Sequence, residues 1–92
     1  MPRAPIAAVA ADDHQIMVFW RVSDGIAYSA HTNQWDPIVT LKDVGPGFGL
    51  TVLEWDNLKY LRIYYENYGE LLLEFYSDDG GKTWHAGKKL SG

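Results

Sequence analysis

The sequence predicts an all-β protein made of two four-stranded antiparallel units. Three observations support this prediction. Eight apolar segments of six to eight residues alternate with turn residues, the segments repeat with a period of about 45 residues, and Trp, Tyr and Phe make up 14% of the 92 residues. Short, regularly spaced segments of this kind are typical of all-β domains.

Four strands are expected in the first half of the chain. They cover residues 5–11, 15–22, 26–31 and 35–41, and the turns between them contain "DDH", "SDG" and "TNQ". Asp, Asn, Ser and Gly favour turns because their side chains bond the local backbone or, in glycine, allow backbone angles that other residues avoid.

The second half repeats this organisation. Its expected strands cover residues 50–55, 59–65, 70–76 and 83–90, with "DNL", "ENYG" and "SDDGGK" between them. The stretch "KDVGPGFG", residues 42–49, is the richest in Gly and Pro, and it is the expected linker between the halves.

A helix over residues 57–76 is the main alternative, because some apolar residues of this stretch recur at helical spacing. The stretch is rich in Tyr, contains Gly69 near its middle and lacks a clear helix cap. These features favour two strands joined by a turn.

The two halves align as a tandem repeat. "IAAVAADD" from Ile6 aligns with "LTVLEWDN" from Leu50, and "IMVFW" from Ile16 aligns with "LRIYY" from Leu61. The repeats are therefore expected to be residues 1–44 and 45–92. Four strands in a period of about 45 residues indicate the blades of a β-propeller.

Two blades cannot close a ring, because both flanks would leave apolar faces and strand edges exposed to water. Symmetric association removes this problem. We therefore expect a homotrimer in which three chains complete a six-bladed propeller. The alternative is that the chain is a fragment of a longer propeller.

The segment "SDDGGKTW" matches the pattern Ser-x-Asp-x-Gly-x-Thr-Trp through Ser77, Asp79, Gly81, Thr83 and Trp84. It resembles the Asp-box, a turn between the last two strands of many propeller blades. The expected role is structural, with the carboxylate accepting backbone N–H bonds inside the turn. The Trp is expected to tuck under the hairpin.

A polar pair lies on the two strands that flank "ENYG". If that turn is a four-residue connection, Arg62 faces Glu74 directly and Tyr64 faces Leu72. The pair has two possible interpretations. It is either a structural ion pair, or it supplies hydrogen-bond donors and acceptors to a sugar ring that packs against aromatic side chains. The opposite face is expected to be apolar, with Leu61, Ile63, Tyr65, Leu71, Leu73 and Phe75.

"LRIYY" with Arg62, followed by Glu74 and Trp84, resembles the blade motif of the Aleuria-type fucose-specific lectins. The resemblance covers nearly the whole chain and implies two-blade chains that trimerise. It also implies that Arg and Glu bind fucose hydroxyls while an aromatic residue of the adjacent blade stacks on the sugar. Trp84 and Trp35 match the hairpin Trp of each repeat, and Ala86 falls near a small pocket residue.

The first repeat departs from this motif, with Met17 at the Arg position and Ser29 at the Glu position. Neither residue replaces the hydrogen bonds of its counterpart. Trp84 is expected to face this altered niche within its own chain.

One complete site per chain is therefore expected, lying across the subunit interface. Arg62 and Glu74 of one chain would meet Trp35, and also His31, of the next chain. Tyr76 is a further candidate for the aromatic wall. Fucose or fucosylated glycans are the expected ligands, and no cofactor is expected.

Composition excludes several classes of protein. The absence of cysteine excludes disulfides and Cys-based zinc sites. The net charge of −4, with only "GKKL" locally basic, argues against nucleic acid as a partner. No apolar run is long enough for membrane insertion. Asp12 and Asp13 interrupt any signal peptide, so we expect a soluble protein that is made in the cytosol and is either cytoplasmic or secreted by a non-classical route.

Two other functions compete with the lectin hypothesis. One is a self-assembling structural propeller without a sugar site. The other is a sialidase-like enzyme, which we do not expect, because the chain has only three arginines and no carboxylate pair with a catalytic spacing. Turn positions explain Asp12, Asp13, Asp24 and Asp78, and the histidines His14, His31 and His85 show no metal-ligand spacing.

Overall fold

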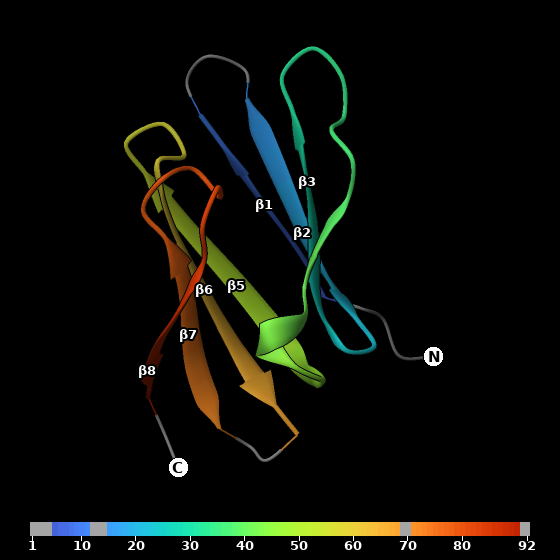
Figure 1. The fold of residues 1–92 in the computed structure, drawn as a ribbon, viewed down its shortest axis with the longest axis vertical. Coiled ribbons are helices and arrows are strands. Elements are labelled where there is room, and N and C mark those ends of the chain that lie inside the picture. The colour runs from blue at the N-terminus through green and yellow to red at the C-terminus, as the bar shows by residue number, and fades with distance from the viewer. Residues whose placement is uncertain (1–4, 12–14, 69–70, 91–92) are drawn as a thin grey trace.

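The computed structural model describes residues 5–11, 15–68 and 71–90, which form two four-stranded antiparallel sheets (Figure 1). In each sheet the strands lie side by side in chain order. The first sheet contains β1 (Ile6–Ala10), β2 (Ile16–Val22), β3 (Gly25–His31) and β4 (Val39–Leu41). The second sheet contains β5 (Gly47–Trp55), β6 (Tyr60–Asn67), β7 (Leu72–Ser77) and β8 (His85–Lys89).

The predicted all-β fold is confirmed, and the helix considered over residues 57–76 is wrong. That stretch forms β6 and most of β7. Buried and partly exposed residues alternate along β6, as they do in a strand. Leu61 and Ile63 are fully buried, whereas Arg62 and Tyr64 point to the other side of the sheet. Helix in the described residues is confined to the single turn η1 (Lys42–Val44), which cannot cross a membrane.

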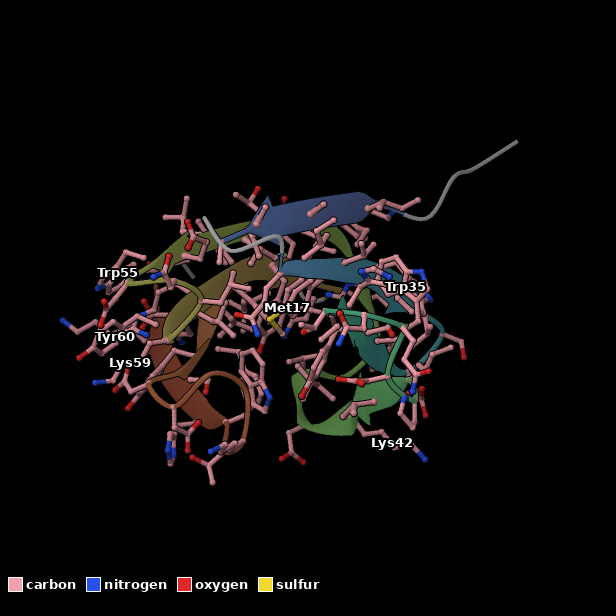
Figure 2. All side chains as sticks on the ribbon, turned by 90° about the horizontal axis from the view of Figure 1, so that it is seen from above. Met17, Trp35, Lys42, Trp55, Lys59 and Tyr60 are labelled. Carbon is pink, nitrogen blue, oxygen red and sulfur yellow. The ribbon has the colours of Figure 1, made fainter. Side chains whose placement is uncertain are left out.

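The two sheets form a wedge. The inner strands β1 and β5 lie next to each other, and the sheets diverge toward β4 and β8 (Figures 1 and 2). We call the side of each sheet that carries Met17 or Arg62 its front face, and the other side its back face. The core forms where the front face of the first sheet meets the back face of the second. It contains Met17, Phe19, Ile26, Tyr28, Leu41, Val44, Val52, Leu58, Leu61, Ile63, Tyr65 and Phe75.

Arg21 braces the linker against both sheets. Its Nη1 donates to the carbonyl oxygens of Gly25 at 3.3 Å and Gly45 at 2.9 Å, and its Nη2 donates to that of Glu66 at 2.8 Å. The predicted linker covers residues 42–49, but β5 already begins at Gly47. A Cβ at Gly47 would collide with the Glu66 carbonyl, so this close approach of β5 to β6 requires glycine.

The pairing of β6 with β7 differs from the prediction by two residues. Arg62 lies opposite Tyr76, and Tyr64 lies opposite Glu74. The four-residue connection over "ENYG" is wrong because β6 continues to Asn67, which pairs with Gly47 at the start of β5. Gly69 of this turn is outside the described residues. A shift of two residues preserves the faces of a sheet, so the predicted apolar layer is still on the back face.

The same pairing pattern recurs in the two sheets. Met17 lies opposite Ala30, as Arg62 lies opposite Tyr76. Phe19 likewise lies opposite Tyr28, as Tyr64 lies opposite Glu74.

The structural counterpart of Glu74 is therefore Tyr28, and the predicted assignment of Ser29 to this position is wrong. Ser29 pairs with Val18 on the back face of the first sheet. Its hydroxyl donates to the carbonyl oxygen of Asp36 at 2.8 Å.

Candidate functional site

Arg62 lies between two aromatic rings on the front face of the second sheet. The centre of its guanidinium group is 4.9 Å from the ring centroid of Trp55 and 4.7 Å from that of Tyr76. The pairing of the strands brings the three side chains together. Tyr76 on β7 is directly opposite Arg62. On β5 the residue opposite Arg62 is Leu53, and Trp55 lies two positions after it on the same face of the sheet. Cation–π contacts with these two rings restrict the movement of the guanidinium group.

One edge of this guanidinium group is tied to the protein. Nη1 of Arg62 donates to Oδ1 of Asp78 at 2.9 Å, and also to the carbonyl oxygens of Leu61 at 3.0 Å and Ser77 at 3.4 Å. Nε and Nη2 donate to no atom of the described residues. The fixed group therefore keeps donors for a ligand.

Asp78 is the ion-pair partner of Arg62, and the predicted direct pair with Glu74 is wrong. The side chains of Arg62 and Asp78 are 21% and 51% exposed. A pair this exposed adds little to stability, so its main effect is to orient the guanidinium group. Asp78 was expected to be only a solvated turn residue.

Glu74 shares the front face with Arg62 but bonds to other groups. Its Oε2 accepts a hydrogen bond from the hydroxyl of Tyr64 at 2.9 Å, and its Oε1 accepts one from the backbone N–H of Lys88 at 3.4 Å. The bond to Glu74 is the main cause that raises the pKa of Tyr64 above its usual value, and burial adds to it. Gly87 leaves room for this carboxylate, because a Cβ there would collide with the Glu74 side chain.

The other residues predicted for the site lie on other faces. Trp84 packs on the core side of the second sheet, with its ring stacked on Phe75 at 5.9 Å and edge-on to Phe19 at 6.3 Å. Trp84 faces the first sheet of its own chain, but it contacts Phe19 and Tyr28 there, and Ser29 of the expected niche lies on the other face of that sheet. Ala86 is opposite Phe75, so it also belongs to the back face, away from Arg62.

Trp35 and His31 lie together on the back face of the first sheet. Their ring centroids are 4.8 Å apart, and Trp35 is 54% exposed. Trp35 lines an open hollow of about 590 Å³ with Val18, Trp20 and Ile38. Within one chain Trp35 and Trp55 are on opposite outer sides of the wedge (Figure 2). The expected contact of Trp35 with Arg62 of another chain stays a prediction.

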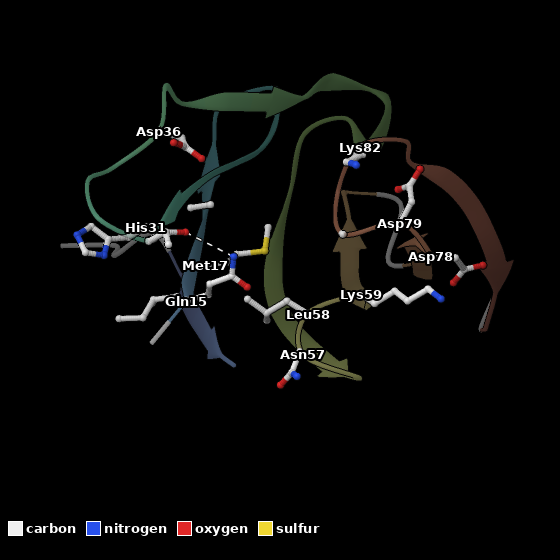
Figure 3. A pocket seen from close by; sticks show the side chains of 14 residues that line it. Gln15, Met17, His31, Asp36, Asn57, Leu58, Lys59, Asp78, Asp79 and Lys82 are labelled. Atoms are coloured by element: carbon white, nitrogen blue, oxygen red, sulfur yellow. Dashed lines mark hydrogen bonds between the residues drawn. The ribbon is translucent and has the colours of Figure 1, made fainter. Parts of the chain in front are cut away.

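A second hollow, of about 510 Å³, opens between the two sheets. Met17 and Ala30 of the first sheet line it on one side, and Leu58, Lys59 and Lys82 of the second line it on the other (Figure 3). Met17 is the counterpart of Arg62 here, and its thioether offers no hydrogen-bond donor to a sugar hydroxyl.

The Asp-box has the predicted structural role. The side chain of Asp79 accepts hydrogen bonds from the backbone N–H and hydroxyl of Thr83 and from the hydroxyl of Ser77. These bonds, those from Thr83 first, hold the pKa of Asp79 well below its usual value. Gly81 adopts the left-handed conformation at φ 92°. All these groups are bonded within the turn.

Three residues of the front face were not predicted as part of the site. Trp55 and Asp78 contact Arg62, and His85 lies opposite Tyr76 with the two rings 5.4 Å apart. The alternation of β5 and β8 places Trp55 and His85 on this face once the register is known. Among the described residues no group of His, Asp or Glu is arranged to hold a metal ion.

Comparison with known proteins identifies no relative. No family model matches the chain, and neither a curated protein nor a solved structure matches it at a significant level.

Proposed function

We propose that this protein is a lectin that binds fucose or fucosylated glycans on the front face of its second sheet. The observation that carries the proposal is the guanidinium group of Arg62, fixed between Trp55 and Tyr76 with donors left over. Sugar rings combine hydroxyls on the rim with apolar C–H faces. Binding them takes fixed donors, nearby acceptors and flat aromatic walls.

The arrangement reduces the loss of entropy on binding. An arginine side chain that is free in water loses rotational freedom about several bonds when it binds a ligand. Arg62 is already held by two rings and by Asp78, so it loses less. Asp78 supplies an acceptor beside the donors. The exposed Trp55 and the half-buried Tyr76 of the same face supply the apolar wall.

We further propose that three chains close a six-bladed ring. The front face of the second sheet exposes Leu53 at 51% and Trp55 at 46%, and the back face of the first sheet exposes Trp35 at 54% and Ile38 at 64%. Two such faces on one small domain favour association with further copies. In the ring, the face around Arg62 would meet the face around Trp35 of the next chain.

A self-assembling ring without a sugar site is the second candidate function. The engagement of Glu74 by Tyr64 favours it, because a carboxylate that already accepts this bond has less capacity for sugar hydroxyls. The lack of donors at Met17, in the equivalent position of the first sheet, points the same way. This candidate predicts normal assembly and no response to any glycan.

Calorimetry with L-fucose, together with a glycan array, tests the lectin proposal. The wild-type protein is expected to bind fucose weakly at each site and to bind clustered fucosylated glycans more tightly through several sites. The Arg62→Ala variant should lose at least about tenfold in affinity, since a hydrogen-bonding cation contributes on this scale. The Lys89→Ala variant removes a charge from β8 opposite Leu73, on the back face, and should bind as the wild type does. Wild-type protein that binds no glycan would overturn the proposal.

A further inference from the structure

We infer that Trp35 of one chain docks on Tyr64 of a second copy and donates its indole N–H to Glu74 of that copy. This inference rests on the ring closure proposed above. It assigns Glu74 and Trp35 to the assembly contact, and it leaves the ligand to Arg62 and its neighbours.

The contact between the two sheets of one chain is the basis of the inference. Trp84 immediately precedes β8, and the pairing of Tyr76 with His85 places its indole on the back face of the second sheet. Nε1 of Trp84 donates to the hydroxyl of Tyr28 at 3.2 Å, and its ring meets Phe19 edge-on. One indole thus joins the back face of one sheet to the front face of the other.

Trp35 occupies the corresponding position in the first sheet. Trp35 forms a β-bridge with His31 at the end of β3. In the second sheet, the pairing of Tyr76 with His85 places Trp84 opposite Ser77 at the end of β7 in the same way. Trp35 therefore belongs to a back face, but no sheet of its own chain covers it. It is 54% exposed, and its indole N–H donates to none of the described residues.

The receiving surface is the front face of the second sheet. The pairing pattern makes Tyr64 the counterpart of Phe19 and makes Glu74 the counterpart of Tyr28. The hydroxyl that accepts the indole N–H within the chain is thus replaced by a carboxylate, which is a stronger acceptor. Tyr64 already holds this carboxylate in place through the 2.9 Å bond to Oε2, and the second oxygen accepts only the longer bond from Lys88.

The hollow between the sheets indicates which residues of the new interface would face a ligand. Met17 and Ala30 line that hollow, whereas Tyr28 and Trp84 are not among its lining residues. Figure 3 shows Met17 at this hollow.

The equivalent hollow between two chains would accordingly be lined by Arg62 and Tyr76, the counterparts of Met17 and Ala30. Glu74 and Trp35 would lie outside it, in the contact that holds the chains together. Glu74 then supports the ring and does not touch the sugar.

A double-mutant cycle on assembly tests this contact. The mass of the protein is measured by sedimentation over a dilution series for the wild type, Trp35→Phe, Glu74→Leu and the double variant. Each single substitution is expected to weaken each interface about tenfold, as loss of a hydrogen bond to a charged acceptor does. The double variant should be no weaker than the weaker single variant, because both changes remove the same bond.

Two controls separate this bond from general damage. Trp20 lines the same hollow as Trp35, so Trp20→Phe removes another indole N–H there, and its effect should add independently to that of Glu74→Leu. Thermal unfolding of Trp35→Phe should match the wild type under dilute conditions, because the side chain is exposed in one chain. Fucose affinity is also measured for Glu74→Leu at concentrations at which the ring is complete, and it should be retained.

The possible outcomes distinguish this inference from the ring itself. A wild-type protein that stays monomeric removes the ring, and this inference falls with it. A wild-type trimer whose Trp35→Phe and Glu74→Leu effects are absent or additive keeps the ring and overturns the contact. If the fully assembled Glu74→Leu variant lost fucose binding, Glu74 would belong to the ligand site, and this result would also overturn the inference.

Discussion

The indole nitrogen of Trp84 donates a 3.2 Å hydrogen bond to the hydroxyl of Tyr28, joining two sheets whose strands are far apart in the sequence. The ring centroids of Trp84 and Tyr28 are 5.6 Å apart, and Phe75 stacks on the indole at 5.9 Å. Trp84 is the last residue of the Asp-box and directly precedes β8, so the hydrogen-bonded turn positions this ring. A turn that looks local in the sequence thus determines how the halves of the chain pack.

Replacement of Trp84 by Ala should strongly destabilise the protein. The change removes the aromatic contacts with Phe19 and Phe75 and leaves the Tyr28 hydroxyl without its donor, so we expect a loss of about 3 kcal/mol in the free energy of unfolding. Urea denaturation measures this quantity. Trp35→Ala is the matched control and should change the stability of the single chain little, because Trp35 is 54% exposed. Equal losses for the two variants would contradict the account.

Asp79→Asn should flatten the acid limb of the stability profile. Hydrogen bonds from Thr83 and Ser77 lower the pKa of Asp79 in the folded protein. Its contribution to stability is therefore fully present above the unfolded pKa of about 4 and is lost as the pH falls toward the lower folded pKa. Thermal melts from pH 6 to pH 2 should show a smaller fall in Tm for Asp79→Asn than for the wild type. Asp24→Asn, in an exposed turn, should behave as the wild type, and identical slopes for all three proteins would refute this role.

Arg62→Lys should not rescue the sugar site, although it keeps the positive charge. Lysine lacks the planar group that Trp55 and Tyr76 hold between them, and it cannot present several donors in fixed directions. We expect an affinity for fucose at least about tenfold below that of the wild type, measured by calorimetry. Affinity close to that of the wild type would show that charge alone matters and that the aromatic sandwich is irrelevant.

Gly87→Ala is a steric probe of Glu74. The added Cβ would collide with the Glu74 side chain, and Gly87 is not in the left-handed conformation, so the backbone itself tolerates alanine. Displacement of the carboxylate from Tyr64 should weaken assembly by several-fold, as measured by sedimentation on dilution. The exposed neighbour Ala86 provides the control as Ala86→Ser, which should assemble normally. Unchanged assembly of Gly87→Ala would argue against a fixed carboxylate at the interface.

The strands, the two units and the Asp-box could be predicted from the sequence because each depends on local patterns. Alternation buries Ile63 and exposes its neighbours, and turn residues mark the ends of every strand. Among the residues expected at the sugar site, Arg62 and the further candidate Tyr76 lie together, whereas Glu74, which the resemblance pairs with Arg62, bonds to Tyr64 instead.

The register could not be predicted, because the sequence does not show where β6 ends. β6 continues to Asn67, which exchanges hydrogen bonds with the backbone of Leu71, and the pairing with β7 differs from the predicted one by two residues. That shift brings Tyr76 opposite Arg62. Asp78, which directly follows β7, is the ion-pair partner in place of Glu74. No sequence pattern near Asp78 distinguished it from a solvated turn residue.

Native mass spectrometry in the presence of fucose tests the central claim most directly. The account predicts a particle of three chains, about 31 kDa from a chain of 10.4 kDa, that binds up to three sugars. It also predicts that single chains hold fucose more weakly than the particle does, because the hollow around Arg62 is enclosed only between copies. A stable 10.4 kDa species at high protein concentration, or a three-chain particle that binds no fucose, would contradict it.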